Sequence, residues 1–551
     1  MKNIVWFLFF LPVVVFGQKM KKADKQIVES VKASITYLAD DKLEGRRAGS
    51  PGEALAISYI TDKFTKAGLS PKGDNNSFLQ PFTIDEGREI NKKTSFFRVD
   101  GKDLDPGTEF YPMGYSPDSK MIEAASAVSV PEKGVPWFIN LAEGLIANKD
   151  NPHFDQPTWI RNQVKNAYDK GATAVVLYNT MDSAADLKYD GKDKSEKTTL
   201  PVIYVTRNAF AKYFSDPEAT YDFKLKVETS AKTRTANNVV GYIDNGAPTT
   251  VVLGAHFDHL GYGEDGNSMI RTGEKLIHNG ADDNASGTAA LLELASLLKK
   301  SKLKKQNYLF IAFSGEELGL LGSSYVANNF PLPIENDIAM INMDMIGRLN
   351  DKNDLIVYGT GTSSKWKNIL DDKNEYDLNL TFNDEGFGPS DHSSFYGKKV
   401  PVLFFFTGTH SDYHKPSDDA DKINSSGEEK VLRYVYDVAA TIVNSDTRPD
   451  YISVERKDTG KMTGTRVYVG TVPDFAGDVD GYKLGGVTDG SPAAKAGLLA
   501  GDIIIKFGEK KISNIYDFTY ALGDHVPGDK VNVLVKRGNE ELTFEIELGS
   551  R

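Results

Sequence analysis

Short apolar runs alternate with amphipathic segments between about residues 236 and 444, and this alternation constrains the fold more than any other feature. The runs carry apolar side chains at consecutive positions, which is typical of parallel strands buried on both faces. Alternating strands and helices predict an α/β fold, with a mostly parallel mixed sheet and helices on both of its faces. The predicted strands are residues 249–253, 308–313, 338–343, 355–358 and 400–406.

The chain has 551 residues, which is too long for a single domain. Helical spacing of apolar residues predicts two helices before residue 69, and short β-like runs predict separate β-rich regions farther along. The predicted parts are 18–105 and 231–445 for the α/β core, 106–230 for a β-rich inserted domain, 446–464 for a linker and 465–551 for a small β-rich domain.

The first residues indicate export from the cytoplasm. Lys2 is followed by an apolar run at residues 4–16, and the small residue Gly17 suits a peptidase cut before Gln18. The run is shorter than the roughly 20 residues that a membrane span needs. We therefore expect residues 1–17 to be a signal peptide, and the mature protein to be periplasmic or secreted and without a membrane span.

Composition removes several classes of function. Lys and Arg number 65 against 77 Asp and Glu, a formal charge of −12, which argues against nucleic acid as a partner. The chain has no cysteine, which excludes disulfides, a thiol nucleophile and a thiolate metal site.

Acids and histidines gather at the ends of the predicted strands. Six of the eight histidines lie in the α/β region, and several polar residues directly follow an apolar run. Ligands of open α/β sheets bind outside the carboxyl ends of the strands, so we expect these side chains to converge on one edge. The residues are His256, Asp283, Glu316, Glu317, Asp344 and His414.

Such a cluster predicts a metal site. Carboxylates a few ångströms apart repel one another in a partly dry cleft, and two divalent cations would remove that repulsion. Nitrogen and oxygen ligands without sulfur suit zinc in an open catalytic site, and Co²⁺ or Mn²⁺ use the same ligand types. We expect two Zn²⁺ per chain, which would activate water and polarise a carbonyl.

Six segments resemble the co-catalytic di-zinc aminopeptidases of clan MH, of the aminopeptidase Y and S types, which are related to glutamate carboxypeptidase II. They stand in the family's order and span the peptidase core. They are GAHFDHLG at 254–261, GADDNASG at 280–287, SGEELGLLGS at 314–323, INMDMIGR at 341–348, and SDHSSF with DYHKPSD at 390–395 and 412–418.

The resemblance implies a role for each metal ligand. Asp283 would bridge both metals, His256 and Asp344 would complete one, and Glu317 and His414 would complete the other.

The same resemblance implies three further roles. Glu316 would be the general base and later acid, Asp258 would hold the far nitrogen of the His256 ring, and Tyr413 would donate to the oxyanion. Other groups receive ordinary interpretations. His259, His278 and His410 are expected to be loop or packing histidines, Asp391 and His392 to lie at the site wall, and residues 44–47 (Glu-Gly-Arg-Arg) to form a salt-bridged turn.

Two flanking regions carry resemblances of their own. The inserted segment, with NAYDKGATAVVLYN at 166–179, resembles a protease-associated domain, and the tail resembles a PDZ domain of the bacterial protease type. PDZ domains bind extended peptides at a sheet edge. The loop at 468–470 (Tyr-Val-Gly) departs from the strict Gly-Leu-Gly-Phe pattern, so a peptide ligand and a packing or regulatory role both stay open.

Together these features predict an exported zinc exopeptidase that removes N-terminal residues from peptides through a metal-bridging water and a Glu base. One alternative is a carboxypeptidase or dipeptidase on the same core, for which Arg348 could hold the substrate carboxylate. A cyclase of N-terminal glutamine shares the fold but uses one metal, and the five-ligand set argues against it. A non-catalytic peptide-binding scaffold is the other alternative, and the oligomeric state is left open.

Overall fold

The computed structural model describes residues 22–149, 151, 154–193, 195–270, 274–454, 467–473, 481–487, 490–512, 515–538 and 540–550. The predicted signal peptide at 1–17 lies outside these residues. The chain divides into two compact units, one of Met1–Phe82 with Thr235–Arg551 and one of Thr83–Arg234. Among the described residues, no helix is both long and apolar enough to cross a membrane.

The first unit contains a nine-stranded mixed sheet in the described part of the chain, in the order β1-β11-β13-β12-β14-β17-β15-β16, with β2 also pairing with β11. The four central strands β13, β12, β14 and β17 are parallel, whereas β11 and β15 run antiparallel to their central neighbours. The strands are β1 Ser70–Pro71, β2 Leu79–Ile90, β11 Thr229–Ile243, β12 Thr250–His256, β13 Asn307–Phe313, β14 Asp337–Met343, β15 Asp354–Tyr358, β16 Asn379–Asn383 and β17 Val402–Phe406.

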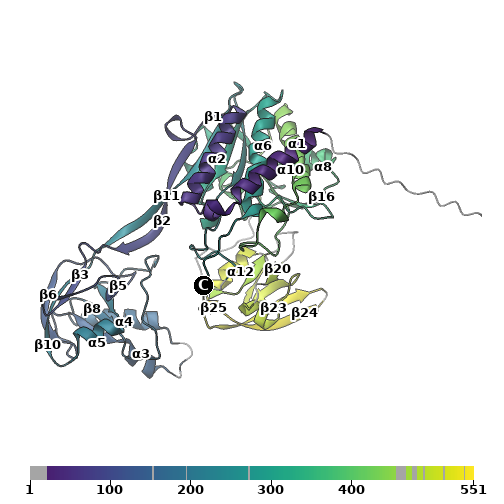
Figure 1. Ribbon diagram of the computed structural model, residues 1–551. Coiled ribbons are helices and arrows are strands. Elements are labelled where there is room, and N and C mark those ends of the chain that lie inside the picture. The colour runs from purple at the N-terminus through teal and green to yellow at the C-terminus, as the bar shows by residue number, and fades with distance from the viewer. Residues whose placement is uncertain are drawn as a thin grey trace, which may run out of the picture. The chain divides into compact units, whose positions relative to one another are not determined.

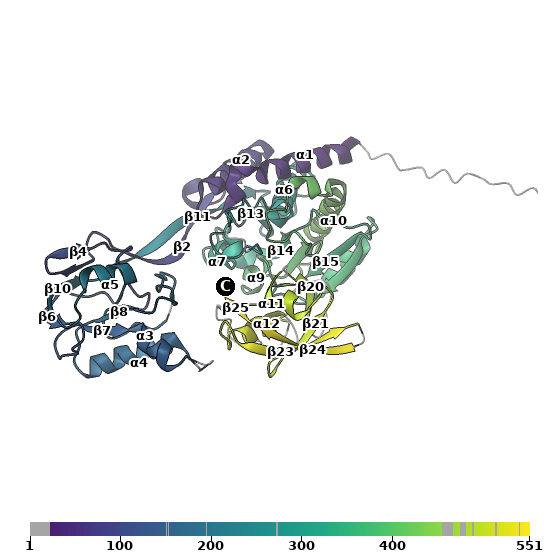
Figure 2. The ribbon, with the colours of Figure 1, turned by 60° about the horizontal axis from the view of Figure 1, so that its bottom comes forward.

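Side chains of the central strands alternate between two hydrophobic cores, one on each face of the sheet. Leu253 and Phe310 pack into one core, while Val252 and Ile311 pack into the other. The first core is covered by α1 Lys22–Leu38, α2 Pro51–Ala67, α6 Gly287–Lys300, α8 Trp366–Lys373 and α10 Ser425–Asn444, and the second by α7 Leu321–Asn328 and α9 His392–Tyr396. Figures 1 and 2 show α1, α2, α6 and α10 together, and Figure 2 shows α7 and α9 on the opposite side of the strands. The predicted α/β fold is therefore confirmed. Helices cover both faces of the sheet, as strands that are buried on both faces require.

All five predicted strands are present, with ends that shift by at most three residues. The apolar runs do not indicate that β15 runs antiparallel to β17. They also do not reveal the edge strand β16, because β16 has only half-buried or exposed residues. Both termini of helix α2 have the capping residues that its sequence indicates. Ser50 caps its start by accepting from the Glu53 amide, and Gly68 ends it with φ +83°.

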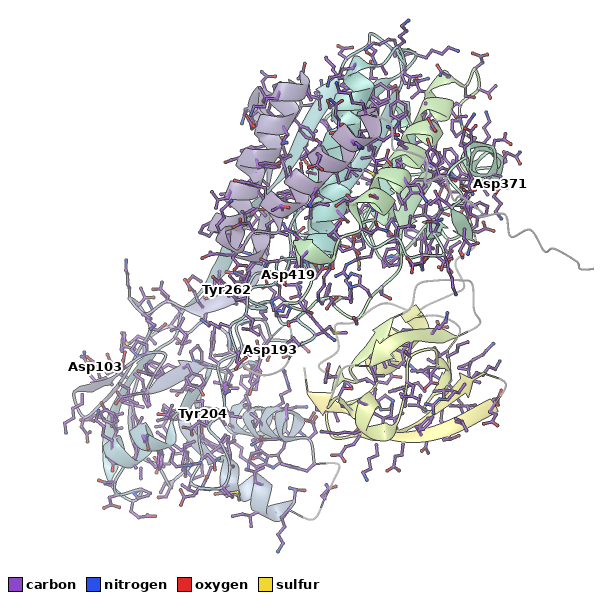
Figure 3. All side chains as sticks on the ribbon, turned by 45° about the vertical axis from the view of Figure 1, so that its right-hand side comes forward. Asp103, Asp193, Tyr204, Tyr262, Asp371 and Asp419 are labelled. Carbon is purple, nitrogen blue, oxygen red and sulfur yellow. The ribbon has the colours of Figure 1, made fainter. Side chains whose placement is uncertain are left out.

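The second unit, Thr83–Arg234, contains two four-stranded sheets and three helices within its described residues. One sheet is β4 Lys102–Leu104, β3 Phe96–Val99, β10 Thr220–Lys226 and β6 Ile122–Ala127; the other is β5 Phe110–Pro112, β9 Val202–Val205, β8 Val175–Tyr178 and β7 Trp137–Asn140. The helices are α3 Leu141–Ala147, α4 Gln156–Asp169 and α5 Arg207–Tyr213. The buried Tyr204 of β9, labelled in Figure 3, donates its hydroxyl to Asp186 at 2.5 Å. The unit begins earlier than the predicted boundary at residue 106, because β3 and β4 share a sheet with β6 and β10.

The C-terminal region of the first unit forms a small β-rich fold with its own core. Its main sheet has the order β19-β20-β21-β23-β24, with β22 beside β21 and a separate β18–β25 pair. The strands are β18 Val467–Tyr468, β19 Thr471–Pro473, β20 Tyr482–Val487, β21 Ile503–Phe507, β22 Lys510–Lys511, β23 Lys530–Arg537, β24 Glu540–Glu547 and β25 Gly549–Ser550, and the helices are α11 Pro492–Ala496 and α12 Ile515–Leu522.

Candidate metal centre

Four loops bring the predicted site residues to one edge of the sheet. His256 is the last residue of β12, Glu316 and Glu317 follow β13 in the short turn Glu316–Leu318, and Asp344 directly follows β14. Asp283 lies in the segment Ala281–Ser286 before α6. Because β12, β13 and β14 are parallel, their carboxyl ends lie side by side, and the side chains that follow them converge.

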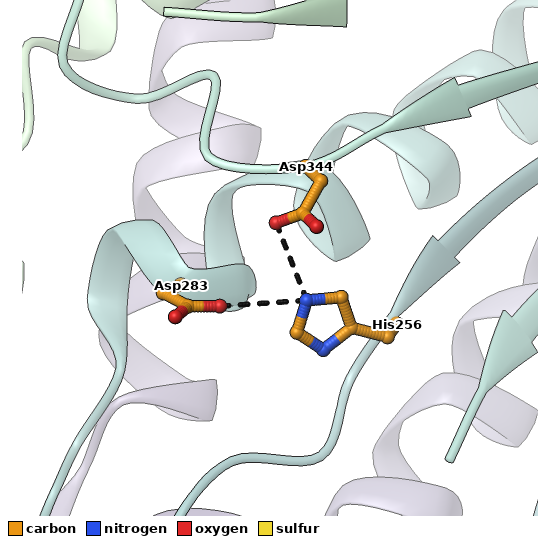
Figure 4. A group of neighbouring side chains, drawn as sticks. All are labelled: His256, Asp283 and Asp344. Carbon is orange, nitrogen blue, oxygen red and sulfur yellow. Dashed lines mark ion pairs between the residues drawn. The ribbon is translucent and has the colours of Figure 1, made fainter. Parts of the chain in front are cut away.

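One group consists of His256, Asp283 and Asp344 (Figure 4). The Nε2 atom of His256 lies 3.4 Å from Asp283 Oδ1 and 3.2 Å from Asp344 Oδ1. All three residues are buried. Asp344 Oδ1 makes no hydrogen bond within the described chain, so a buried acceptor points at the centre of this group.

A second group lies on the other side of Asp283. The Nε2 atom of His414 is 3.3 Å from Asp283 Oδ2 and 3.1 Å from Glu317 Oε2. His259 also reaches this group, with Nδ1 2.7 Å from Glu317 Oε1 and 3.9 Å from Asp283 Oδ2. Asp283 therefore faces one group with each of its carboxylate oxygens.

The donor set suits divalent cations. Each group offers carboxylate oxygens and imidazole nitrogens in a buried setting, and thiolates are absent from the sequence. Around Asp283 the imidazoles outweigh the effect of burial and hold the pKa of its carboxyl well below the usual range. The carboxylate of Asp283 thus stays ionised and ready to bind a cation, which is the state that metal ligation requires.

Glu316 and Glu317 are neighbours in sequence but have opposite electrostatic settings. Burial, together with the nearby carboxylates of Glu317 and Asp344, raises the pKa of Glu316 well above its usual value. Burial also opposes the charge of Glu317, but His414 and His259 outweigh it and lower its pKa to about 2. Two neighbouring carboxyls whose pKa values shift in opposite directions are typical of one proton-transfer group beside one ligand.

Asp258 lies behind His256. Its Oδ1 atom is 3.7 Å from His256 Nδ1 and accepts the backbone N–H of Glu316 at 3.2 Å, while the backbone carbonyl of Asp258 is 3.2 Å from the same ring nitrogen. The fully buried Asp258 therefore contacts both a ligand histidine and the turn that carries Glu316.

Tyr413 stacks on the ring of His414, with centroids 4.0 Å apart and an interplanar angle of 21°. Burial and the surrounding carboxylates raise the pKa of its hydroxyl well above the usual value, so the hydroxyl keeps its proton and is a donor.

A pocket of about 360 Å³, including its open mouth, adjoins both groups. Its polar wall consists of Asp283, Glu316, Asp344, Tyr413 and His414. Its apolar wall consists mainly of Met345, Pro389, Phe404 and Phe406. The pocket therefore combines carboxylate and imidazole groups on one wall with an apolar surface on the other.

His259 and Arg46 belong to the site although the sequence assigned them ordinary roles. His259 stands three residues after His256, and this second histidine after a strand end was the available signal. Arg46 is fully buried rather than part of a surface turn, and it donates to the carbonyls of Phe257, Leu38, Asn279 and Gly280. It thereby ties the segment before Asp283 to the end of β12. The neighbouring Arg47 does form the expected ion pair, with Asp265 at 2.7 Å.

Other candidate residues lie apart from the ligand atoms. Arg348 contacts Asp412 and Asp418 at 3.1 and 3.2 Å. The Nε2 atom of His278 is hydrogen-bonded to Ser268 Oγ at 2.7 Å. His392 stacks on Phe404 with centroids 4.7 Å apart, behind the apolar wall of the pocket.

A mixed α/β sheet with paired carboxylate–imidazole groups at its carboxyl edge defines an α/β domain built around a metal-ligand cluster. Residues 238–439 match the model of peptidase family M28, and residues 454–548 match that of the PDZ domain. The chain thus contains a region that matches peptidase family M28, followed by a region that matches the PDZ domain.

Individual proteins are similar to parts of this chain. Aminopeptidase YwaD of Bacillus subtilis is 27% identical over 320 residues, which cover 54% of this chain and 62% of that protein. Leupeptin-inactivating enzyme 1 of Streptomyces exfoliatus is 31% identical over 195 residues, covering 34% of this chain and 43% of that protein. The structure of an aminopeptidase from Aneurinibacillus sp. strain AM-1 is 26% identical, with a TM-score of 0.42, over 79% of this chain and 98% of that one. The chain therefore covers less than two thirds of the length of these two curated relatives.

Proposed function

We propose that this protein is a zinc-dependent exopeptidase that hydrolyses N-terminal residues from peptides. The observation that carries the proposal is the pair of ligand groups that share Asp283, beside a buried Glu316 at an open pocket. The relatives named as aminopeptidases support the activity, and one of the similar structures is that of a zinc aminopeptidase from Bacillus subtilis.

Two zinc ions would be held by five side chains. His256 and Asp344 would hold one ion, Glu317 and His414 the other, and Asp283 would contact both through its two oxygens. His259, at 2.7 Å from Glu317, would orient that ligand or join it. When bound, zinc supplies an activated water and polarises the scissile carbonyl; Co²⁺ and Mn²⁺ accept the same donors.

Glu316 is the proton carrier in this proposal. Its raised pKa allows it to take a proton from the attacking water, whose hydroxyl oxygen bonds to the carbonyl carbon. As the C–N bond breaks, Glu316 returns the proton to the leaving amine. Asp258 contributes by fixing the backbone N–H of Glu316 and the orientation of the His256 ring.

Tyr413 supports the same step from the other wall of the pocket. Its protonated hydroxyl donates a hydrogen bond to the carbonyl oxygen as that oxygen becomes an anion, and its stacking on His414 limits the ring to one orientation.

The charge of the pocket favours an N-terminal amine over a C-terminal carboxylate. The residues that line the pocket in the described chain include three acids and neither Lys nor Arg. Arg348, the cation that a carboxypeptidase could use, is instead within 3.2 Å of the carboxylates of Asp412 and Asp418. An ammonium group is stabilised in such a setting, whereas a carboxylate is repelled.

The flanking regions have proposed roles as well. Residues 1–17 would direct export to the periplasm or the medium. The unit Thr83–Arg234 would be a protease-associated domain. The PDZ domain would offer a sheet edge to an extended peptide ligand.

The decisive experiment compares three forms of the mature chain on aminoacyl chromogenic amides and on N-acetylated peptides with a free C-terminus. These forms are the zinc-loaded protein, the chelated protein and the protein reconstituted with zinc. We expect activity on the aminoacyl amides alone, and only when zinc is present. Turnover of the acetylated peptides would favour the carboxypeptidase alternative, and absence of any bound metal would favour the scaffold.

A further inference from the structure

A second group of charged side chains lies beyond the metal-ligand groups, and none of its members is a proposed ligand. It consists of Asp282, Arg348, His410, Asp412 and Asp418, and we refer to it as the outer ion network. Asp282 and Asp418 are fully buried, and the side chains of the other three are 15–17% exposed. Its members come from the three loops that also carry Asp283, Asp344 and His414.

Asp418 is the centre of this network. One of its oxygens, Oδ2, accepts the backbone N–H groups of both Asp282 and Asp283, at 2.9 and 3.0 Å. Its other oxygen, Oδ1, accepts from Arg348 at 3.2 Å. The backbone N–H of Asp283 therefore donates a charge-assisted hydrogen bond to Asp418, which stands four positions after His414.

Asp282 connects the same loops in another direction. Its Oδ1 atom accepts the backbone N–H of Gly347 at 2.7 Å, three residues after Asp344. Its Oδ2 atom lies 3.2 Å from Nε2 of His410, in the loop that leads to Tyr413 and His414. Each of the three ligand-bearing loops is thus bonded to the other two through this network.

We propose that the outer ion network sets the relative positions of Asp283, Asp344 and His414, with Asp418 as its principal positioning residue. The proposal rests on the proposed function, because it concerns how tightly the chain holds the metals. Asp418 touches neither ligand atoms nor substrate; it acts through the backbone of Asp283.

The alternative is that these charges stabilise the fold alone. Exposed ion pairs contribute little, but a buried carboxylate that is removed leaves its donors without a partner. In Asp418→Asn the amide oxygen can still face the two backbone N–H groups, and the NH₂ group then opposes Arg348, which is also a donor. The substitution therefore keeps the volume and disturbs the link between the loops.

A matched control is available beside the network. Glu428 is fully buried near Asp282, and within the described chain neither of its carboxylate oxygens has a hydrogen-bond partner. Burial raises the pKa of Glu428 well above its usual value, which favours the neutral carboxyl that an amide resembles. Glu428→Gln makes the same chemical change as Asp418→Asn in an equally buried place, without breaking a link.

The test titrates metal-free mature protein with Zn²⁺ calorimetrically and records the visible spectrum of the Co²⁺-loaded protein. We expect Asp418→Asn to weaken at least one zinc site about 10- to 100-fold, as is typical when a partner behind a ligand is lost. The Co²⁺ bands, which report ligand geometry, should shift, and kcat should fall with little change in KM. Glu428→Gln should match the wild type in all of these measurements.

A double variant separates positioning from general destabilisation. Arg348→Gln should weaken zinc binding by itself, and adding it to Asp418→Asn should cost less than the sum, because the Gln oxygen can accept from the new NH₂ group. Additive losses, or an Asp418→Asn protein with wild-type zinc affinity and Co²⁺ spectrum, would overturn the proposal. If Asp418→Asn does not fold, the zinc affinity and the Co²⁺ spectrum of Arg348→Gln alone test the proposal.

The zinc titration needs no substrate, so the two proposals can fail separately. A wild type that binds two zinc ions but cleaves no peptide overturns the proposed function, while the Asp418→Asn comparison still decides the role of the network. A wild type that binds no zinc overturns both.

Discussion

The metal-ligand groups and the outer ion network use the same kinds of side chain in neighbouring places, but they differ in what balances their charge. The network pairs Asp282, Asp412 and Asp418 with Arg348, Lys422 and His410. The ligand groups hold Asp283, Glu317 and Asp344 beside imidazoles alone, and no Lys or Arg lines the adjoining pocket in the described chain.

This difference distinguishes a structural role for the network from a ligand-binding role for the metal-ligand groups. The network is neutralised by the chain's own cations: Lys422 and Ser417 donate to Asp412, and these bonds outweigh burial and lower its pKa to about 2. In the described chain, imidazoles are the only cationic groups in direct contact with the ligand carboxylates, and burying carboxylates without full compensation of their charge is costly. We therefore expect an external cation to bind between these carboxylates.

Metal removal should produce the largest effect and tests the comparison directly. Without cations the ligand carboxylates repel one another, so chelation should abolish detectable peptidase activity and lower the Tm, and added Zn²⁺ should restore both. Activity assays and thermal unfolding of the same samples measure this. Full activity after exhaustive metal removal would show that the ligand groups do not need a cation.

Glu316→Gln should have the next largest effect. The amide cannot carry a proton between water and the leaving amine, so we expect kcat to fall about 10²- to 10⁴-fold. Zinc stoichiometry should stay unchanged because Glu316 is not a proposed ligand. Glu317→Gln is the matched control and should lose zinc at one site; equal zinc loss in both variants would contradict the separation of roles.

His414 and His259 offer a smaller and sharper test within the second ligand group. His414 Nε2 faces both Asp283 and Glu317, at 3.3 and 3.1 Å, whereas His259 approaches Glu317 closely and Asp283 only at 3.9 Å. We expect His259→Asn to cost about 10- to 100-fold in zinc affinity, as a partner of a ligand does. His414→Ala should cost more, and the reverse order in calorimetry would make His259 the ligand.

The strands of the core and the residues at their ends could be predicted from the sequence because both depend on local patterns. Residues such as those from 308 to 313 are apolar at every position, and the polar residues after them mark the carboxyl edge. Arg46 and Asp418 could not be found in this way. Their roles depend on contacts such as Asp418 with the Asp283 amide, across 135 residues of sequence. Likewise, the boundary at Thr83 depends on the pairing of β3 with β10, which no local pattern reveals.

The last and smallest test concerns His392. This residue is a buried imidazole whose pKa shift is opposite to that of the ligand histidines. Carboxylates around His256 and His414 outweigh burial and raise the pKa of both rings, whereas burial alone lowers the pKa of His392 to about 3. In the unfolded chain a histidine has a pKa of about 6.5. Between those values the unfolded state binds more protons than the folded state, so His392 destabilises the fold as the pH falls.

The expected size follows from that shift. Between pH 7 and pH 5, His392 should remove about 2 kcal/mol from the free energy of unfolding. His392→Phe keeps a ring against Phe404 and cannot titrate, and any packing cost that it carries is the same at both pH values. Urea unfolding at the two pH values should therefore show a smaller loss in the variant than in the wild type, by about 2 kcal/mol. Equal losses would mean that the folded protein already protonates His392 at pH 5, which requires an anionic partner that this ring, unlike His256, does not have in the described structure.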